Sequence, residues 1–223
     1  MSDNRDSDII RMLSADLTPV RPLASPGQRA ATWLAAVVLL ALPLSVFGDL
    51  QAMVHRLAAT TDMTFAAIGS LLTAILAAIA AFQLSQPDRR TTWALLPLPA
   101  LVLWIGASGF GCFRSWIIAD THVASMRETM DCLLFIVAIS IPLAALLFLM
   151  LRRGYSLQPN LTAVVGGLAC AAAAATLLNF VHPFDAAVTD LVAHAVAVGL
   201  VILVIRMLGG RLLTEKKISD LPV

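Results

Sequence analysis

Two cysteines at corresponding positions are the residues of this sequence best suited to chemistry. Cys112 closes the third uncharged segment of the chain and Cys132 opens the fourth, with a polar loop between them. Antiparallel neighbouring helices would bring them near the Cα separation of about 5.5 Å that a disulfide needs. Thiolates also bind soft metal ions. The residues alone leave three interpretations open: a structural disulfide, a pair of sensing thiols, or two inert thiols.

Polar side chains that could support these two cysteines fall in the same loop and near the end of the chain. They are His122, Asp131, His182, Asp185 and His194, with Asp120 and Glu128 beside the first two. No C-x-x-C or H-x-x-x-H spacing indicates a dedicated metal cage. We therefore expect no resident cofactor, which leaves room only for a soft heavy-metal ion bound transiently at Cys112 and Cys132.

Catalysis and nucleic-acid binding receive no support from the sequence. No catalytic dyad, glycine-rich phosphate loop or HExxH zinc motif is present, so we expect that the protein is not an enzyme. The 15 basic and 14 acidic residues form no polycationic surface of the kind that binds nucleic acid directly.

The composition is that of a membrane protein. Hydrophobic residues make up 59% of the 223 residues and charged residues only 13%, and the mean hydropathy is +0.87. Soluble domains are roughly 45–50% apolar and about 25% charged. A soluble fold could not bury so much apolar surface, whereas a lipid bilayer can accommodate it.

Six segments are long and apolar enough to cross a bilayer, which takes about 20 residues each. We expect spans over residues 30–48, 63–84, 92–111, 132–151, 161–181 and 186–208, within a membrane domain over 29–210. The last span is the weakest, because it includes Asp190 and His194. The sequence thus predicts an all-α bundle of six transmembrane helices.

Small residues and prolines indicate how these spans pack. Small side chains recur at four-residue spacing at Ala66, Ser70, Ala74 and Ala78, and again at Gly166, Cys170 and Ala174. Such stripes let helix backbones approach closely in lipid, and we expect packing within the chain rather than a homodimer seam. Oligomeric state stays open. Pro43, Pro97, Pro99 and Pro142 are expected to kink or break their spans.

The distribution of charge predicts the orientation. If the six spans alternate, 12 of the 15 basic residues fall on one side, which carries a formal charge of +5 against −4 on the other. The positive-inside rule places the basic side in the cytoplasm, so both termini are expected there.

The cytoplasmic head over residues 1–28 is expected to hold a short amphipathic helix at 7–17 and a proline-rich tether. Ile9, Ile10, Leu13 and Leu17 share one helical face. Three interpretations remain open for this face: packing on the bundle or fraying in solution, anchoring at the membrane interface, or insertion into a partner's groove. Residues 211–223 are expected to form a cytoplasmic tail.

Several short motifs in a fixed order carry a family resemblance. They are Leu13-Ser-Ala-Asp-Leu-Thr-Pro-Val-Arg-Pro-Leu23, Gly109-Phe-Gly-Cys112, Cys132-Leu-Leu-Phe-Ile136 with Pro142, Arg152-Arg-Gly154 with Pro159, and His182-Pro-Phe-Asp185 with His194. Over nearly its whole length the chain resembles the NrsF family of proteobacterial inner-membrane anti-sigma factors. The third cysteine, Cys170, and the tail over 214–223 look peculiar to this chain.

The resemblance implies that the protein holds an extracytoplasmic-function (ECF) sigma factor at the bacterial inner membrane until stress releases it. It implies that Cys112 and Cys132 sense oxidants or heavy metals. It also implies partner contacts in the head, carried over to Leu13, Asp16, Leu17, Pro19, Val20 and Arg21. The alternatives are a small transporter or metal-permeation protein and a non-catalytic structural subunit.

Overall fold

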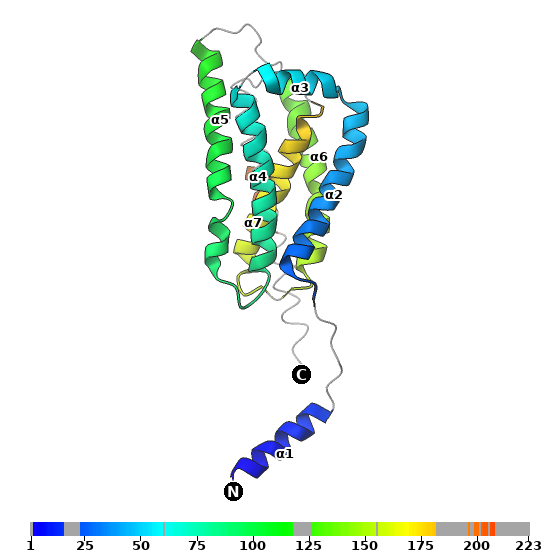
Figure 1. Ribbon diagram of the computed structural model, residues 1–223, viewed down its shortest axis with the longest axis vertical. Helices are drawn as coiled ribbons and strands as arrows, with labels where there is room; N and C mark the ends of the chain where they lie inside the picture. The colour runs from blue at the N-terminus through cyan, green and yellow to red at the C-terminus, as the bar shows by residue number, and fades with distance from the viewer. Residues whose placement is uncertain are drawn as a thin grey trace.

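The computed structural model describes residues 2–15, 23–59, 61–117, 126–154 and 156–181, with short helical pieces between 196 and 207. Every regular element in those ranges is a helix, which confirms the prediction of an all-α chain for this part of the protein (Figure 1). The elements are α1 (Ser2–Ala15), α2 (Pro26–Phe47), α3 (Leu50–Ala59), α4 (Thr61–Leu84), the 3-10 helix η1 (Thr91–Leu95), α5 (Leu98–Ile117), α6 (Met126–Leu151) and α7 (Pro159–Leu178).

Five stretches are long and apolar enough to cross a membrane, and they overlap the first five expected spans. They are Pro26–Val46, Thr61–Leu84, Thr91–Phe110, Leu133–Leu151 and Pro159–Leu178. Large apolar side chains such as Val46, Val102 and Ile141 are exposed on their outer surfaces. That surface is compatible with a membrane protein. The sixth expected span, 186–208, and the tail over 211–223 lie almost entirely outside the described residues.

The centre of the bundle is the contact between α4 and α7, which run side by side (Figure 1). Both helices bury mainly small side chains there, including Ala74, Ala77 and Ala78 on α4 and the run Ala171–Ala174 on α7. The Thr176 hydroxyl donates to Ser70 Oγ at 3.0 Å across the contact. The small-residue stripes therefore pack within the chain, and the fully buried Cys170 is one of the packing residues, as expected.

The helices that carry Cys112 and Cys132, α5 and α6, have different main neighbours among the described residues. α5 packs along α4, whereas α6 packs along α7 and α2. The backbone of α5 approaches α4 closely at Gly69: a Cβ at this position would lie 2.7 Å from the Trp104 amide nitrogen. A glycine at this contact permits the close approach of the two helices.

Prolines and a short helix account for the remaining differences from the expected spans. Pro43 and Pro142 lie inside continuous helices, while Pro97 separates η1 from α5 and so breaks the third span. The connection after α2, for which the sequence predicts no element, forms α3, whose start is capped by Asp49 Oδ1 accepting from the Ala52 amide at 2.8 Å.

Substituting Gly69 tests the close approach of α4 and α5. Gly69→Ala is expected to lower the thermal stability of the detergent-solubilised protein, because the added Cβ overpacks the contact at a cost of about 1–3 kcal/mol. Gly106→Ala on α5 is the matched control, since a Cβ there meets nothing within 4 Å. Equal melting temperatures for the two variants would contradict this packing.

Candidate functional site

The N-terminal helix α1 presents apolar side chains that are exposed in the described part of the chain. Ile9, Ile10 and Met12 expose 48%, 67% and 74% of their surfaces. α1 lies apart from the bundle, beyond the end at which α2 begins (Figure 1). It starts at Ser2, five residues earlier than the expected start at residue 7.

Most of the predicted partner-binding positions fall outside the described residues. These are the side chain of Leu13 and the whole of Asp16, Leu17, Pro19, Val20 and Arg21. Of the predicted set, Ile9 and Ile10 are placed by the structure, and both are exposed.

The tether joins α2 through a well-defined helix start. Ser25 Oγ accepts from the Gln28 amide at 3.3 Å, and Gln28 Oε1 accepts from the Ser25 amide at 3.2 Å. This reciprocal pair is a capping box, and Pro26 occupies the first turn with its φ already helical. The point at which the head leaves the bundle is therefore fixed by local sequence.

Arg29 lies directly before the first expected span, and nothing in the sequence distinguishes it from the other arginines beside the spans. The structure buries it, with 5% of its surface exposed. Its guanidinium donates to Ser85 Oγ at 3.2 Å and to the Met150 carbonyl, and lies 4.9 Å from the centroid of the Phe82 ring. We call Arg29, Phe82, Ser85 and Met150 the Arg29 junction. It joins the first turn of α2 to the ends of α4 and α6.

The turns after α4 and α6 interlock beside this junction. The Ser156 hydroxyl donates to the Leu84 carbonyl at 3.0 Å, and Thr162 reaches the same carbonyl at 3.3 Å. A Cβ on Gly154 would lie 2.7 Å from the Ser85 carbonyl oxygen, so only glycine fits this contact without a shift. The end of the bundle that faces the head is thus tightly built.

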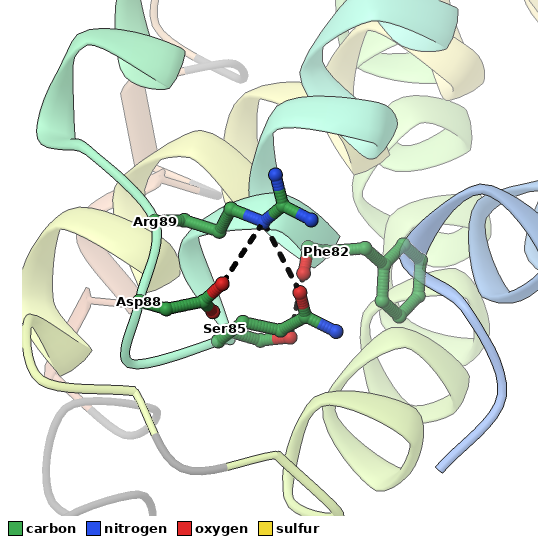
Figure 2. Close-up of polar contacts among 5 residues, drawn as sticks. Phe82, Ser85, Asp88 and Arg89 are labelled. Carbon is green, nitrogen blue, oxygen red and sulfur yellow. Dashed lines mark hydrogen bonds and ion pairs between the residues drawn. The ribbon is translucent and has the colours of Figure 1, made fainter.

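Arg89, by contrast, is a surface residue of the turn that follows α4. Its Nε lies 3.7 Å from Asp88 Oδ2 (Figure 2) and donates to Gln86 Oε1 at 3.3 Å. Nearby, Ser85 Oγ donates to the Phe82 carbonyl at 2.7 Å. The Arg89 side chain is 41% exposed. An ion pair this exposed contributes little to stability.

The two cysteines singled out by their positions lie at the opposite end of the bundle. Cys112 is near the end of α5 and Cys132 is near the start of α6, and these ends lie away from the Arg29 junction. Their side chains are outside the described residues, so their pairing stays a prediction. Asp131, next to Cys132, is exposed.

The other candidate polar residues are not placed. His122, His182, Asp185 and His194 lie outside the described residues. Within the described ranges, no group of three or more histidine, cysteine, aspartate or glutamate side chains is arranged to hold a metal ion.

Comparison with known proteins gives one family. The family model described as NrsF, negative regulator of sigma F, matches residues 13–214. Neither the curated proteins nor the solved structures include a significant match to the chain.

Removing the Ser25 hydroxyl tests the start of α2. Ser25→Ala frees the Gln28 amide, and losing an N-cap costs about 1 kcal/mol. Hydrogen exchange at that amide, followed by mass spectrometry, is expected to speed up about fivefold. Ser45→Ala is the control, because its hydroxyl bonds to the Leu42 carbonyl within the same helix. Unchanged protection at Gln28 would contradict the capping box.

Proposed function

The chain belongs to the NrsF family, the negative regulators of sigma F, and we propose that it is a membrane-bound anti-sigma factor for an ECF sigma factor. The family match over residues 13–214 is the observation that carries the proposal, because it covers nearly the whole chain. It implies a sigma factor as the partner, and membership of a regulator family suggests a non-enzymatic role.

The proposed location is the bacterial inner membrane, with six spans and both termini in the cytoplasm. Five apolar helices support a multi-pass arrangement. The turns after α4 and α6 carry Arg89, Arg90, Arg152 and Arg153 beside the Arg29 junction, and the positive-inside rule assigns such a basic end to the cytoplasm. On this assignment α1 lies on the cytoplasmic side, where a sigma factor is found.

We propose that the head binds the sigma factor by inserting the apolar face of α1 into a groove on the partner. The exposure of Ile9, Ile10 and Met12 supports this, because each of these side chains gains by leaving water. Leu13, Asp16, Leu17, Pro19, Val20 and Arg21 complete the proposed contact, as the family resemblance implies. A free helix of this length is marginal in water, so binding would stabilise it.

We further propose that Cys112 and Cys132 sense an oxidant or a soft heavy metal outside the cytoplasm. Cys112 lies near the end of α5 and Cys132 near the start of α6, which supports a similar depth in the membrane for the two residues. α5 and α6 pack on different helices, so a bond or metal bridge between the two thiols would draw those ends together. Such a bond would shift the packing of the bundle.

The head is tested by deletion and by substitution. Deleting residues 2–22 leaves the capping box of α2 intact and is expected to abolish co-purification of a sigma factor after mild detergent extraction. Ile9→Ser with Ile10→Ser is expected to weaken binding at least about tenfold, since each buried isoleucine contributes about 1.5–3 kcal/mol.

Asp8→Asn provides the control for these variants, because it leaves the apolar face of α1 unchanged. Co-purification of the sigma factor at wild-type level with the 2–22 deletion would refute binding through the head. Since Ile9 and Ile10 are exposed, their substitution is not expected to alter the melting temperature of the bundle.

The sensor is tested by removing its thiols. Cys112→Ser with Cys132→Ser is expected to abolish induction of sigma-dependent transcription by a thiol oxidant or a heavy metal, measured with a promoter reporter in cells. Cys170→Ala, which changes a buried packing cysteine in an alanine run, is expected to keep induction. Full induction in the double variant would exclude sensing by these thiols.

A further inference from the structure

Arg29 is an unusual residue to find buried at the start of a membrane helix. Arginines at the ends of spans normally extend toward water, yet this guanidinium is covered by the ends of α4 and α6. It follows Ser25 by only one turn of helix, so it belongs to the rigid start of α2 from which the head departs.

In the Arg29 junction, the positive charge of Arg29 is stabilised by the carboxyl ends of two helices, α4 and α6. Within the described part of the chain, the partners of Arg29 are the Ser85 hydroxyl, the Met150 carbonyl and the Phe82 ring. Ser85 and Met150 lie at the carboxyl ends of α4 and α6, where backbone carbonyls concentrate partial negative charge. The ring face adds a further cation–π attraction. These contacts offset the cost of burying a cation.

The cost of burying the Arg29 cation makes the Arg29 junction sensitive to the relative positions of α4 and α6. If α6 moved relative to α4, the guanidinium would lose the Met150 carbonyl or the Ser85 hydroxyl, and a buried cation without its partners is expensive. Arg153, on the turn after α6, adds a like charge nearby. The first turn of α2 must therefore move with the end of α6 or detach from it.

A second contact fixes α2 to α6 one turn further along. Trp33 is completely buried, and its indole Nε1 donates to the Leu143 carbonyl at 3.1 Å. Arg29 and Trp33 lie four residues apart on one face of α2, and they contact positions seven residues apart on α6. The contacts of Arg29 with Met150 and of Trp33 with Leu143 together fix the antiparallel helices α2 and α6 to each other.

We propose that Arg29 is a positioning residue that couples α6 to the head, by fixing the start of α2 to the carboxyl ends of α4 and α6. The inference rests on the proposed function and deepens it. α6 carries Cys132 near its first turn and Met150 in its last, so a displacement at the sensing end reaches the junction along one helix. From there, the capping box passes the displacement to the tether.

The coupling is measured as a ratio of affinities. The full-length protein is placed in lipid nanodiscs, and the dissociation constant of its co-purified sigma factor is measured before and after treatment with the thiol oxidant diamide. Wild type is expected to bind about tenfold or more weakly after oxidation, within the usual range of allosteric coupling. Arg29→Met and Ser85→Ala are expected to reduce that ratio to below about threefold.

Two matched variants serve as controls. Arg89→Met removes one arginine from the same end of the bundle, and Ser156→Ala removes a hydroxyl that bonds to α4 and α7 rather than to Arg29. Both are expected to keep the wild-type ratio. A merely structural role for Arg29 would lower both affinities equally and leave the ratio unchanged, which would overturn the inference. If Arg29→Met fails to fold, the ratio of dissociation constants measured for Ser85→Ala tests the coupling in its place.

A distance measurement tests the junction without any stimulus. Spin labels are placed at the exposed positions Leu23 and Leu157 in a background with the three native cysteines replaced. Arg29→Met is expected to broaden the distance distribution and Arg89→Met to leave it narrow. Distance distributions of equal width in the two variants would refute the proposal that Arg29 fixes the start of α2. A wild-type affinity ratio near one would instead contradict the proposed redox release, while the spin-label distances still decide whether Arg29 fixes α2 to α6.

Discussion

The contact between α4 and α7 is the constraint on which the rest of the bundle depends. Helices in lipid gain little from burying apolar surface against one another, so their association relies on close packing. Alanines on both helices make that approach possible, and the hydrogen bond from Thr176 to Ser70 satisfies the polar groups inside it. α5 then packs on α4 and α6 on α7, which places the helices that carry Cys112 and Cys132 on different neighbours.

Hydropathy alone predicted the all-α class and the positions of five apolar helices, because the length of a span is set by the thickness of the bilayer. Which helices become neighbours was not predictable in the same way. Small residues indicate that a helix can pack closely, but they do not indicate which helix it packs against. The close fit of α5 against Gly69 is visible only in the three-dimensional structure. α3 was missed because ten residues between two long spans resemble a loop.

The candidate site was predictable in part for similar reasons. The apolar residues of the head follow a helical period, and the structure leaves Ile9 and Ile10 exposed. Arg29 is indistinguishable by sequence from the other arginines that flank spans. Its burial depends on the ends of α4 and α6 converging on the first turn of α2, which no local pattern encodes. The sequence indicated the head and the two thiols. The structure adds the Arg29 junction, which connects the bundle to the tether.

We propose that the chain, embedded in a membrane, keeps a sigma factor from acting on RNA polymerase. The decisive experiment measures transcription from a sigma-dependent promoter with purified polymerase core and sigma factor as nanodiscs containing the full chain are added. Transcription is expected to fall as the chain approaches equimolar amounts with the sigma factor, while empty nanodiscs have no effect. Transcription that stays constant at excess chain would contradict it.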